Sequence, residues 1–451
     1  MDKVLLTIWF VLFFISELNA LYYAFWFVAG LFFRTKKYPE KPDERRFCVF
    51  VPCHNEEAVV AATVKNFCGI TYDPNLFDVY FLADNCTDST VETLNAAIEE
   101  SGKSNFKVLV RNVSDADKQG KPHALKWGIE YLENNGGFYS NYDFFMIIDA
   151  DNFVDGNILK QLNSQYLSYK ENKRPDLIQV YHDSKNARGL IARGYFQAYR
   201  VFNPFWQKSK DRLGVSPGIY GTGYIITTKF LKEIGGFDCN SLTEDQEIQA
   251  KAVIAGKRVA YNANTRIYAE HPTKIRQAVR QRIRWAQGHW YLFFKYYFRL
   301  FIQLFNPKTW RATFRKLDMM AVLFTKIAMA CSALLTVLNI YYLIFEPGAN
   351  ALSPAINYIN IGLGVLSVIM VPVSAFYGGT DEEKRRVVID FIPNVLAITV
   401  YGVIEAFSSF IGLFKCGNQK VWSKTEHNLT SVTAGKTKNK KVKKRLKQKI
   451  N

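Results

Sequence analysis

Acidic side chains follow three predicted strands in the first third of the chain. Glu56 comes after the apolar run "FCVFVP", Asp84 ends the run "FDVYFLAD", and Asp149 and Asp151 follow "YDFFMII". In a sheet built from alternating strands and helices, the ligand binds beyond the carboxyl ends of the strands, so we expect these acids to lie near one another. Each group alone could instead be a helix cap or a turn, since Asp and Asn favour both.

Asp149 and Asp151 flank Ala150 in the segment "DADN" and have a spacing that suits a cation site. Two carboxylates at positions i and i+2, just beyond a strand, can both bear on one hard divalent ion. Mg²⁺ and Mn²⁺ prefer such oxygen ligands and complete their coordination with phosphate oxygens. The pair therefore predicts a Mg²⁺ or Mn²⁺ site next to a phosphorylated ligand.

Two later segments carry further candidate residues. Gly221 and Gly223 flank Thr222, and glycines there would let a ligand approach the backbone closely, although a plain turn fits equally well. Glu244 and Asp245 stand at a predicted helix start, where the helix dipole favours anions. A carboxylate in that position can accept a proton during catalysis, or it can simply cap the helix.

A helix predicted over residues 277–290, "QAVRQRIRWAQGHW", has two different faces. Gln281, Arg284, Trp285 and Gly288 recur at three- and four-residue spacing on one of them. An ordinary amphipathic helix is the alternative, but the polar and aromatic face is a candidate site. The apolar stripe expected to face the core lies on the other face and comprises Val279, Ile283, Ala286 and Trp290.

Between about residues 39 and 290, short apolar runs alternate with helical patterns. This alternation predicts a mainly parallel sheet with helices on both faces. The chain has 451 residues, 49% of them hydrophobic, which leaves room for membrane segments beside such a domain.

Residues 4–33 form a long apolar stretch whose single charge is Glu17, and "RTKK" follows at once. Its length exceeds the roughly 20 residues that a bilayer core requires, and the positive-inside rule places the next domain in the cytoplasm. Three more apolar stretches, 319–345, 355–377 and 387–414, lie near the C-terminus. If all three cross the membrane, the lysine-rich tail lies outside. Asp390 and Pro393 favour a third stretch that runs partly along the interface, which keeps the tail in the cytoplasm.

The formal charge is +18, and residues 436–449 contribute nine Lys or Arg without any acid. Such a tail suits anionic lipid on the cytoplasmic leaflet, although a solvated, disordered tail is the simpler alternative. Nucleic acid is not an expected partner, because no zinc-finger, homeodomain or RNA-binding signature is present. Residues 291–305, "YLFFKYYFRLFIQLF", are predicted to form an interfacial helix, with a buried core helix as the alternative.

Taken in order, "PCHNEE", "ADNCTDST", "DAD", "TED" and "QRIRW" resemble the membrane-embedded, processive glycosyltransferase family 2 enzymes, which include cellulose synthase, hyaluronan synthase and poly-N-acetylglucosamine synthase. The resemblance covers about residues 45–290. It implies a GT-A-type (Rossmann-like) α/β domain in the cytoplasm, joined to transmembrane and interfacial helices. The implied segments are 1–38 (transmembrane helix), 39–290 (catalytic domain), 291–317 (interfacial helices), 318–416 (transmembrane region) and 417–451 (gating-like segment and basic tail).

The resemblance also implies roles for individual residues. Asp245, with Glu244, is expected to be the general base. Trp285 is expected under the acceptor sugar, and Gly221, Thr222 and Gly223 are also expected to bind the acceptor. The residues expected to bind the donor are Glu56, Asp84 (at uracil), Lys121, Asp149 and Asp151 (with the metal), Gln281 and Arg284. The tail segment "VWSKTEH" resembles a gating segment and contains Trp422, Lys424, Thr425 and His427, with a plain linker as the alternative.

The expected activity is inverting transfer from a UDP-sugar, with UDP-glucose favoured, to a growing β-linked polysaccharide that is exported across the plasma membrane. The motifs also fit a poly-N-acetylglucosamine or hyaluronan-type synthase, and a non-processive enzyme that glycosylates a lipid carrier. A non-catalytic membrane scaffold or transporter is disfavoured by the D-x-D and T-E-D segments.

Overall fold

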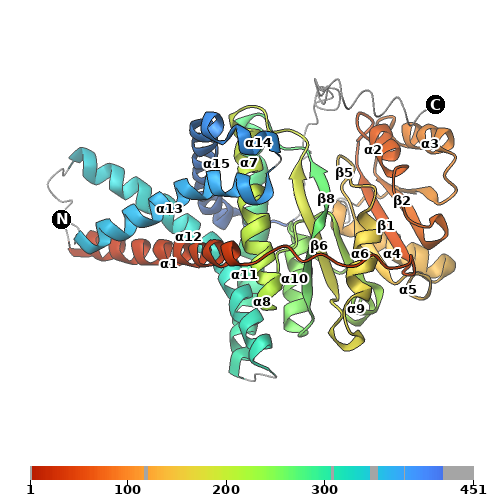
Figure 1. Cartoon of the computed structure of the whole chain (residues 1–451), viewed down its shortest axis with the longest axis horizontal. Helices are drawn as coiled ribbons and strands as arrows, with labels where there is room; N and C mark the ends of the chain where they lie inside the picture. Colours follow the sequence, from red (N-terminus) through yellow and green to blue (C-terminus); the bar gives the residue numbers. More distant parts are fainter. Residues whose placement is uncertain (1–2, 116–119, 306–308, 346–353, 380, 420–451) are drawn as a thin grey trace.

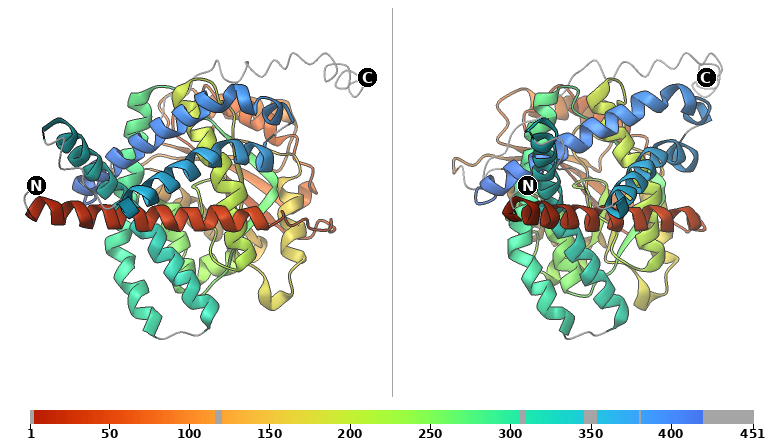
Figure 2. Two further views of the ribbon diagram at one scale, coloured as in Figure 1. Left: turned by 60° about the vertical axis from the view of Figure 1, so that its left-hand side comes forward. Right: turned by 90° about the vertical axis from the view of Figure 1, so that its left-hand side faces the viewer.

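The computed structural model describes residues 3–115, 120–305, 309–345, 354–379 and 381–419. An α/β domain occupies one end of the molecule, and long apolar helices extend from the other (Figure 1). Those helices include α1 (Lys3–Phe32), α12 (Trp310–Phe345) and α13 (Pro354–Gly378). The two views in Figure 2 show α1 and α13 on the same side of the α/β domain.

A mixed sheet forms the centre of the α/β domain, and in the described ranges it has eight strands in the order β3-β2-β1-β4-β7-β6-β8-β5. The central strands are almost wholly buried, which fits their dense content of Val, Ile and Phe, whereas the edge strand β3 is partly exposed. Their bounds are β1 Phe47–Cys53, β2 Phe77–Asp84, β3 Phe106–Arg111, β4 Phe144–Ile147, β5 Phe153–Val154, β6 Leu177–Ser184, β7 Tyr224–Thr227 and β8 Val259–Ala269.

The sheet is parallel only in part. Strands β3, β2, β1 and β4 are mutually parallel, and β6 is parallel to β8. Strand β7 is antiparallel to both β4 and β6, and β5 is antiparallel to β8. The mainly parallel sheet predicted from the alternation is therefore confirmed: among the described strands, β7 and β5 run in the opposite direction to the other six. Helical residues 190–213 and a glycine-containing loop connect β6 to β7, and this long connection returns the chain antiparallel to β6.

Helices cover both faces of the sheet, as the sequence predicts. One apolar core joins the sheet to α2, α3 and α6, and a second joins it to α4, α5, α9 and α10. The bounds of the helices in this domain are α2 Val60–Phe67, η1 Pro74–Leu76, α3 Thr90–Ser101, α4 Lys121–Gly136, α5 Phe138–Asn141, α6 Ile158–Leu167, η3 Glu171–Lys173, α7 Leu190–Val201, η4 Phe202–Gln207, α8 Lys208–Leu213, α9 Thr228–Glu233 and α10 Glu244–Ile254.

The segment that contains "QRIRW" belongs to one continuous helix, α11 (Ile275–Ile302), which is followed by η5 (Gln303–Phe305). The boundary expected after Trp290 falls inside this helix, and the boundary expected after Leu317 falls inside α12. Neither position has a proline or a cap that would end a helix, so the "QRIRW" segment and the aromatic run share one rigid element.

Three described helices are long and apolar enough to cross a membrane: α1, the Trp310–Tyr342 part of α12, and α15 (Val387–Lys415). The Gly362–Gly378 part of α13 is shorter. The short helix α14 (Asp381–Arg385) precedes α15. Helix α15 packs against α7, α11 and α12, and it crosses the direction of α1 rather than running beside it (Figures 1 and 2). Both ends of α15 therefore lie against or beside the catalytic domain.

Candidate functional site

A cavity of about 1180 Å³ lies at the carboxyl ends of the strands, between the sheet and helices α1, α7, α11, α12 and α15. Its volume exceeds the roughly 300–1,000 Å³ of ordinary small-ligand pockets, so it has room for two ligands. Twelve of the residues expected at the site line this cavity: Glu56, Asp84, Lys121, Asp149, Asp151, Gly221, Thr222, Glu244, Asp245, Gln281, Arg284 and Trp285.

Asp84 is held rigidly at the end of β2. Arg111, which faces it in the β2–β3 register, places Nη1 2.6 Å from Asp84 Oδ1, and the backbone N–H of Gly120 donates to Oδ2 at 3.3 Å. His54 Nδ1 lies 2.7 Å from the carbonyl oxygen of Asp84. Asn85 Nδ2 also donates to Oδ1 at 3.3 Å, so Oδ2 is the oxygen with a lone pair left for a further donor, such as a nucleobase N–H. The sequence analysis did not single out Arg111, whose signal is its place at the end of the neighbouring strand.

Lys121 connects three loops at the first residue of α4. Its ammonium lies 2.7 Å from Asp149 Oδ1, 2.8 Å from the carbonyl oxygen of Gly221 and 3.1 Å from Glu244 Oε1. Burial alone would lower the pKa of Lys121, but the charges of Asp149 and Glu244 outweigh it and raise that pKa. The side chain therefore carries a permanent positive charge beside the D-x-D segment.

The Gly221–Thr222–Gly223 loop supports the D-x-D segment from behind. The Thr222 hydroxyl accepts from the Asp149 N–H at 3.1 Å and from Asn152 Nδ2 at 2.8 Å. Both glycines have positive φ, 70° and 65°, which favours glycine. Gly223 is not among the cavity-lining residues; a Cβ there would lie 2.8 Å from Ile267. The loop thus shapes the wall, with the Thr222 hydroxyl turned toward Asp149.

Asp149 and Asp151 have the oxygen donors that a divalent cation prefers, and both line the cavity. Among the described residues, no group of three or more His, Cys, Asp or Glu side chains forms a complete metal site. The two carboxylates therefore fit a cation whose remaining ligands are phosphate oxygens and water. His271, which also lines the cavity, places Nε2 2.6 Å from the hydroxyl of Ser184.

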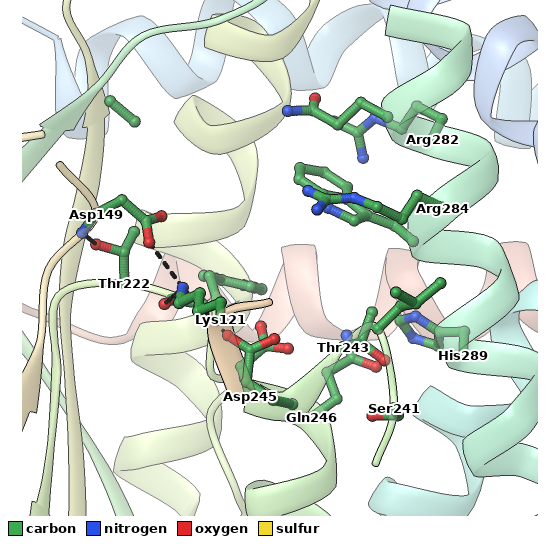
Figure 3. A pocket seen from close by; sticks show the side chains of 18 of the residues that line it. Lys121, Asp149, Thr222, Ser241, Thr243, Asp245, Gln246, Arg282, Arg284 and His289 are labelled. Atoms are coloured by element: carbon green, nitrogen blue, oxygen red, sulfur yellow. Dashed lines mark hydrogen bonds and ion pairs between the residues drawn. The ribbon is translucent and has the colours of Figure 1, made fainter. Parts of the chain in front are cut away.

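Asp245 and Glu244 begin α10 and line the same cavity. Figure 3 shows Asp245 facing it. Burial, with help from the negative charge of Glu244, raises the pKa of Asp245 to about 7. A carboxylate with that pKa can hold or release a proton near neutral pH, which suits a general base. Thr243 occupies the N-cap position, but its side chain makes no capping hydrogen bond.

Helix α11 brings Gln281, Arg284 and Trp285 to the cavity. The Tyr195 hydroxyl donates to Gln281 Oε1 at 2.9 Å. Arg284 extends from the helix into the cavity (Figure 3); its burial lowers its pKa, while the charges of nearby acids, Glu244 first, oppose that shift. Helix α11 approaches α10 closely at Gly288, where a Cβ would lie 2.8 Å from the backbone nitrogen of Thr243. Gly288 therefore permits the contact between the two catalytic segments.

Several polar atoms beside α11 are buried and have no hydrogen-bond partner within the described residues. These atoms are Ser241 Oγ, Thr243 Oγ1, Gln246 Oε1 and His289 Nδ1, and all four residues line the cavity (Figure 3). Burial, assisted by Lys326, lowers the pKa of His289 to about 3, so the ring is neutral. A neutral cluster of unpaired donors and acceptors suits the hydroxyl groups of a sugar. Sequence reasoning missed these residues, although His289 lies one turn beyond Trp285.

The described chain ends at the rim of the cavity. The backbone N–H of Leu242 donates to Gln419 Oε1 at 2.9 Å, and Gln287 Nε2 donates to the carbonyl oxygen of Lys415 at 3.2 Å. Gly417, Asn418 and Gln419 line the cavity. The four residues expected to form a gating segment, Trp422, Lys424, Thr425 and His427, lie outside the described residues.

Fold and site together define a GT-A-type glycosyltransferase. Residues 42–288, more than half of the chain, match the family described as "Glycosyltransferase like family 2", and the chain belongs to that family. The family resemblance and the fold class expected from the sequence are thereby confirmed.

The similar proteins have low sequence identity to this chain, but their alignments cover more than half of it. The chain is 24% identical over 389 residues to the probable glycosyltransferase YdaM of Bacillus subtilis, covering 84% of this chain and 86% of YdaM. It is 24% identical over 363 residues to the beta-monoglucosyldiacylglycerol synthase of Synechocystis, covering 80% and 69%. The poly-beta-1,6-N-acetyl-D-glucosamine synthase of Staphylococcus aureus is 23% identical over 274 residues, covering 58% and 62%.

A solved structure shares the fold. The mannosyltransferase PcManGT from Pyrobaculum calidifontis, solved with GDP-Man and Mn²⁺, has a TM-score of 0.54 and 16% identity, with 88% of this chain and 99% of that chain covered.

Proposed function

We propose that this enzyme transfers a sugar, with inversion, from a UDP-sugar to an acceptor hydroxyl at the membrane surface. The observation that carries the proposal is the convergence of Asp84, Asp149, Asp151, Asp245 and Trp285 on one cavity, although they come from separate segments. The nucleotide fits the strand ends, and the acceptor fits the side next to α11.

The reaction proposed is a single displacement at the anomeric carbon. The acceptor lies against the indole of Trp285, and Asp245 takes the proton of its hydroxyl as that oxygen attacks. The bond from the anomeric carbon to the diphosphate breaks, and the electron pair leaves with UDP. Arg284 and Lys121 face the departing negative charge. A divalent cation bound by Asp149 and Asp151 would supply further neutralisation of the diphosphate.

The donor proposed is UDP-glucose, followed by UDP-N-acetylglucosamine. Support for a glucosyl donor comes from "TEDQEI" and "QRIRW", which are closest to glucan synthases among the family segments considered. The glucosyl transferase and the N-acetylglucosamine polymer synthase among the relatives make these two donors the first to compare.

The acceptor proposed first is a growing β-linked polysaccharide. The cavity continues past Trp285 to aromatic residues of α1 and of the segment before α8, which suit a sugar chain leaving toward the membrane: Tyr22, Tyr23, Trp26, Phe202 and Trp206. Single transfer to a lipid is the second candidate. It is favoured by the diacylglycerol-linked relative, whose alignment covers 80% of this chain against 58% for the polymer synthase.

The proposed setting is the plasma membrane, crossed more than once, with the catalytic domain in the cytoplasm. The "RTKK" segment after α1 supports this orientation. Lys415, at the end of α15, accepts a hydrogen bond from Gln287, and Gln419 accepts one from Leu242. The proposed tail therefore begins on the same side of the membrane as the α/β domain, where its lysines would meet anionic lipid.

The test is UDP release by the purified full-length protein with Mn²⁺ or Mg²⁺, one UDP-sugar at a time, beside the variant Asp245→Asn. Release by the native enzyme and not by the variant supports the proposal, and its absence with every UDP-sugar contradicts it. Product size then separates a polymer from a singly glycosylated lipid.

A further inference from the structure

Helix α15 carries an acidic residue, Glu405, in an otherwise apolar environment. Its side chain is buried, and only 4% of the residue is exposed. Glu405 Oε2 lies 3.0 Å from Arg282 Nη1 of α11, and Oε1 pairs with Lys326 of α12. Both cationic side chains are also buried, at 7% and 8% exposure. A buried charge is costly unless it is paired, so Glu405 stabilises two cations that would otherwise be uncompensated.

Arg282 in turn lies among aromatic rings at the cavity wall. Its guanidinium is 4.3 Å from the ring centre of Trp285, 4.3 Å from that of Tyr195 and 4.4 Å from that of Tyr401. Within the described residues, Glu405 is the single carboxylate that forms an ion pair with it. The guanidinium therefore connects Glu405 to the indole expected to seat the acceptor.

Helix α15 is itself fixed tightly against α11 on the far side of this contact. Trp290 Nε1 donates to the carbonyl oxygen of Ser409 at 2.8 Å. A Cβ on Gly412 would lie 2.5 Å from Cβ of Ala286, so the two backbones approach closely there. Glu405 thus occupies a defined position relative to the turn of α11 that carries Trp285.

We propose that Glu405 is a positioning residue for the acceptor: it fixes the guanidinium of Arg282, and Arg282 fixes the orientation of the Trp285 indole. This inference rests on the proposed function, because it assigns Trp285 to the acceptor. Glu405 touches neither the donor nor the reacting atoms. Its loss should therefore affect the transfer step and leave nucleotide binding intact.

The network contains two cations and one anion, and this imbalance allows a matched set of variants. Glu405→Gln removes the anion and leaves both cations unpaired. Lys326→Met removes a cation but keeps the Glu405–Arg282 pair, so it is the control. The double variant Glu405→Gln/Lys326→Met reduces the uncompensated charge to one, yet still lacks the partner of Arg282.

The experiment uses the full-length protein in lipid nanodiscs and measures three quantities. They are the melting temperature, the dissociation constant of UDP with Mn²⁺, and the rate of UDP release from UDP-glucose. We expect Glu405→Gln to lower the release rate by about 10-fold, less than the loss of the Trp285 ring itself, because a misplaced indole still supplies part of its contact, and to leave UDP binding unchanged. Lys326→Met should stay close to the native rate. The double variant should regain melting temperature but not rate.

The orientation of the indole is followed separately by fluorescence. Subtracting the emission of a matched Trp285→Phe variant isolates the contribution of Trp285, and this contribution should change in Glu405→Gln but not in Lys326→Met. A double variant with native rate, or a Glu405→Gln protein with native rate and native Trp285 emission, would overturn the inference. If the native protein releases no UDP, the proposed function fails, whereas the fluorescence comparison still decides the link between Glu405 and Trp285.

Discussion

The two sides of the cavity are built from different kinds of contact. The strand side, which comprises Asp84, Lys121, Asp149 and Asp151, consists of charged groups, and two of its acids are already ion-paired. The helix side surrounds the Trp285 indole and combines the charged Arg282 and Arg284 with neutral residues. Four of these neutral residues have a buried polar atom without a hydrogen-bond partner in the described part of the chain: Ser241, Thr243, Gln246 and His289.

This difference teaches how one cavity can treat two substrates differently. Preformed charges on the strand side suit a diphosphate whose negative charge grows as the bond breaks. Unpaired neutral groups on the helix side suit an acceptor that brings its own hydroxyl groups. Asp245 lies between the two sides, so a substitution of Asp245 is the first test of whether the two sides bind different substrates.

The largest expected effect is that of Asp245→Asn. Removing the base should lower the rate of UDP release by about 1,000-fold, because proton transfer typically contributes about 10²–10⁴. The affinity for UDP, measured by titration calorimetry, should stay near the native value. A variant that loses rate and UDP affinity together would show that Asp245 belongs to the strand side instead of standing between the two.

The next effect concerns the cation. Removing divalent ions with EDTA, or replacing Asp151 with Asn, should lower the rate by about 100-fold, or about 3 kcal/mol, because charge on the leaving group is less stabilised. Adding Mn²⁺ in excess should restore the native enzyme fully and Asp151→Asn only in part. An unchanged rate of UDP release in EDTA would contradict a cation site on the strand side.

Trp285→Ala should lower the rate less, by about 30-fold, or about 2 kcal/mol, since it removes a platform and no charge. Trp285→Phe keeps an aromatic face and should retain more activity. Normal UDP binding by both variants, measured in the same titration, would support the assignment of the helix side to the acceptor. Weaker UDP binding by either variant would contradict it.

The pH profile should show an acid limb set by Asp245. Below its pKa of about 7 the base is protonated, so the rate should fall about tenfold for each pH unit and be level above pH 7. Glu244 helps to raise this pKa by repulsion, so Glu244→Gln should move the limb to lower pH. A limb that stays in place in Glu244→Gln would assign it to another group.

The smallest expected effect is structural. Gly288→Ala places a methyl group 2.8 Å from the Thr243 nitrogen, and the overpacking should destabilise the fold by about 2 kcal/mol. Gly402→Ala is the matched control, because a Cβ there meets nothing within 4 Å. Melting temperatures of the two variants compare them directly, and equal values would show that α10 and α11 can separate at no cost.

The strand side was largely predictable from the sequence, because a local pattern carries it. Asp84, Asp149 and Asp151 each end or follow an apolar run, and the carboxyl ends of parallel strands must meet. The antiparallel entry of β7 was not predictable, since a four-residue apolar run shows no direction.

On the helix side, the sequence predicts the motif on α11 but not the residues that surround it. Gln281, Arg284 and Trp285 stand out through helical spacing, whereas the partners of the motif come from distant segments. Glu405 is more than a hundred residues from Arg282 in the chain, and nothing near either residue shows the pair. An acid in the apolar second half of the helix was the one available signal, since such a charge requires a partner.

Helix α11 has 28 residues and therefore spans about 42 Å without a break. Its first half carries Trp285, and its second half exposes Phe294, Phe298 and Ile302. Because the helix is continuous, a small tilt of its exposed apolar half would also move the Trp285 indole in its first half. If this exposed end lies in lipid, we expect a change in bilayer thickness to shift the position of Trp285.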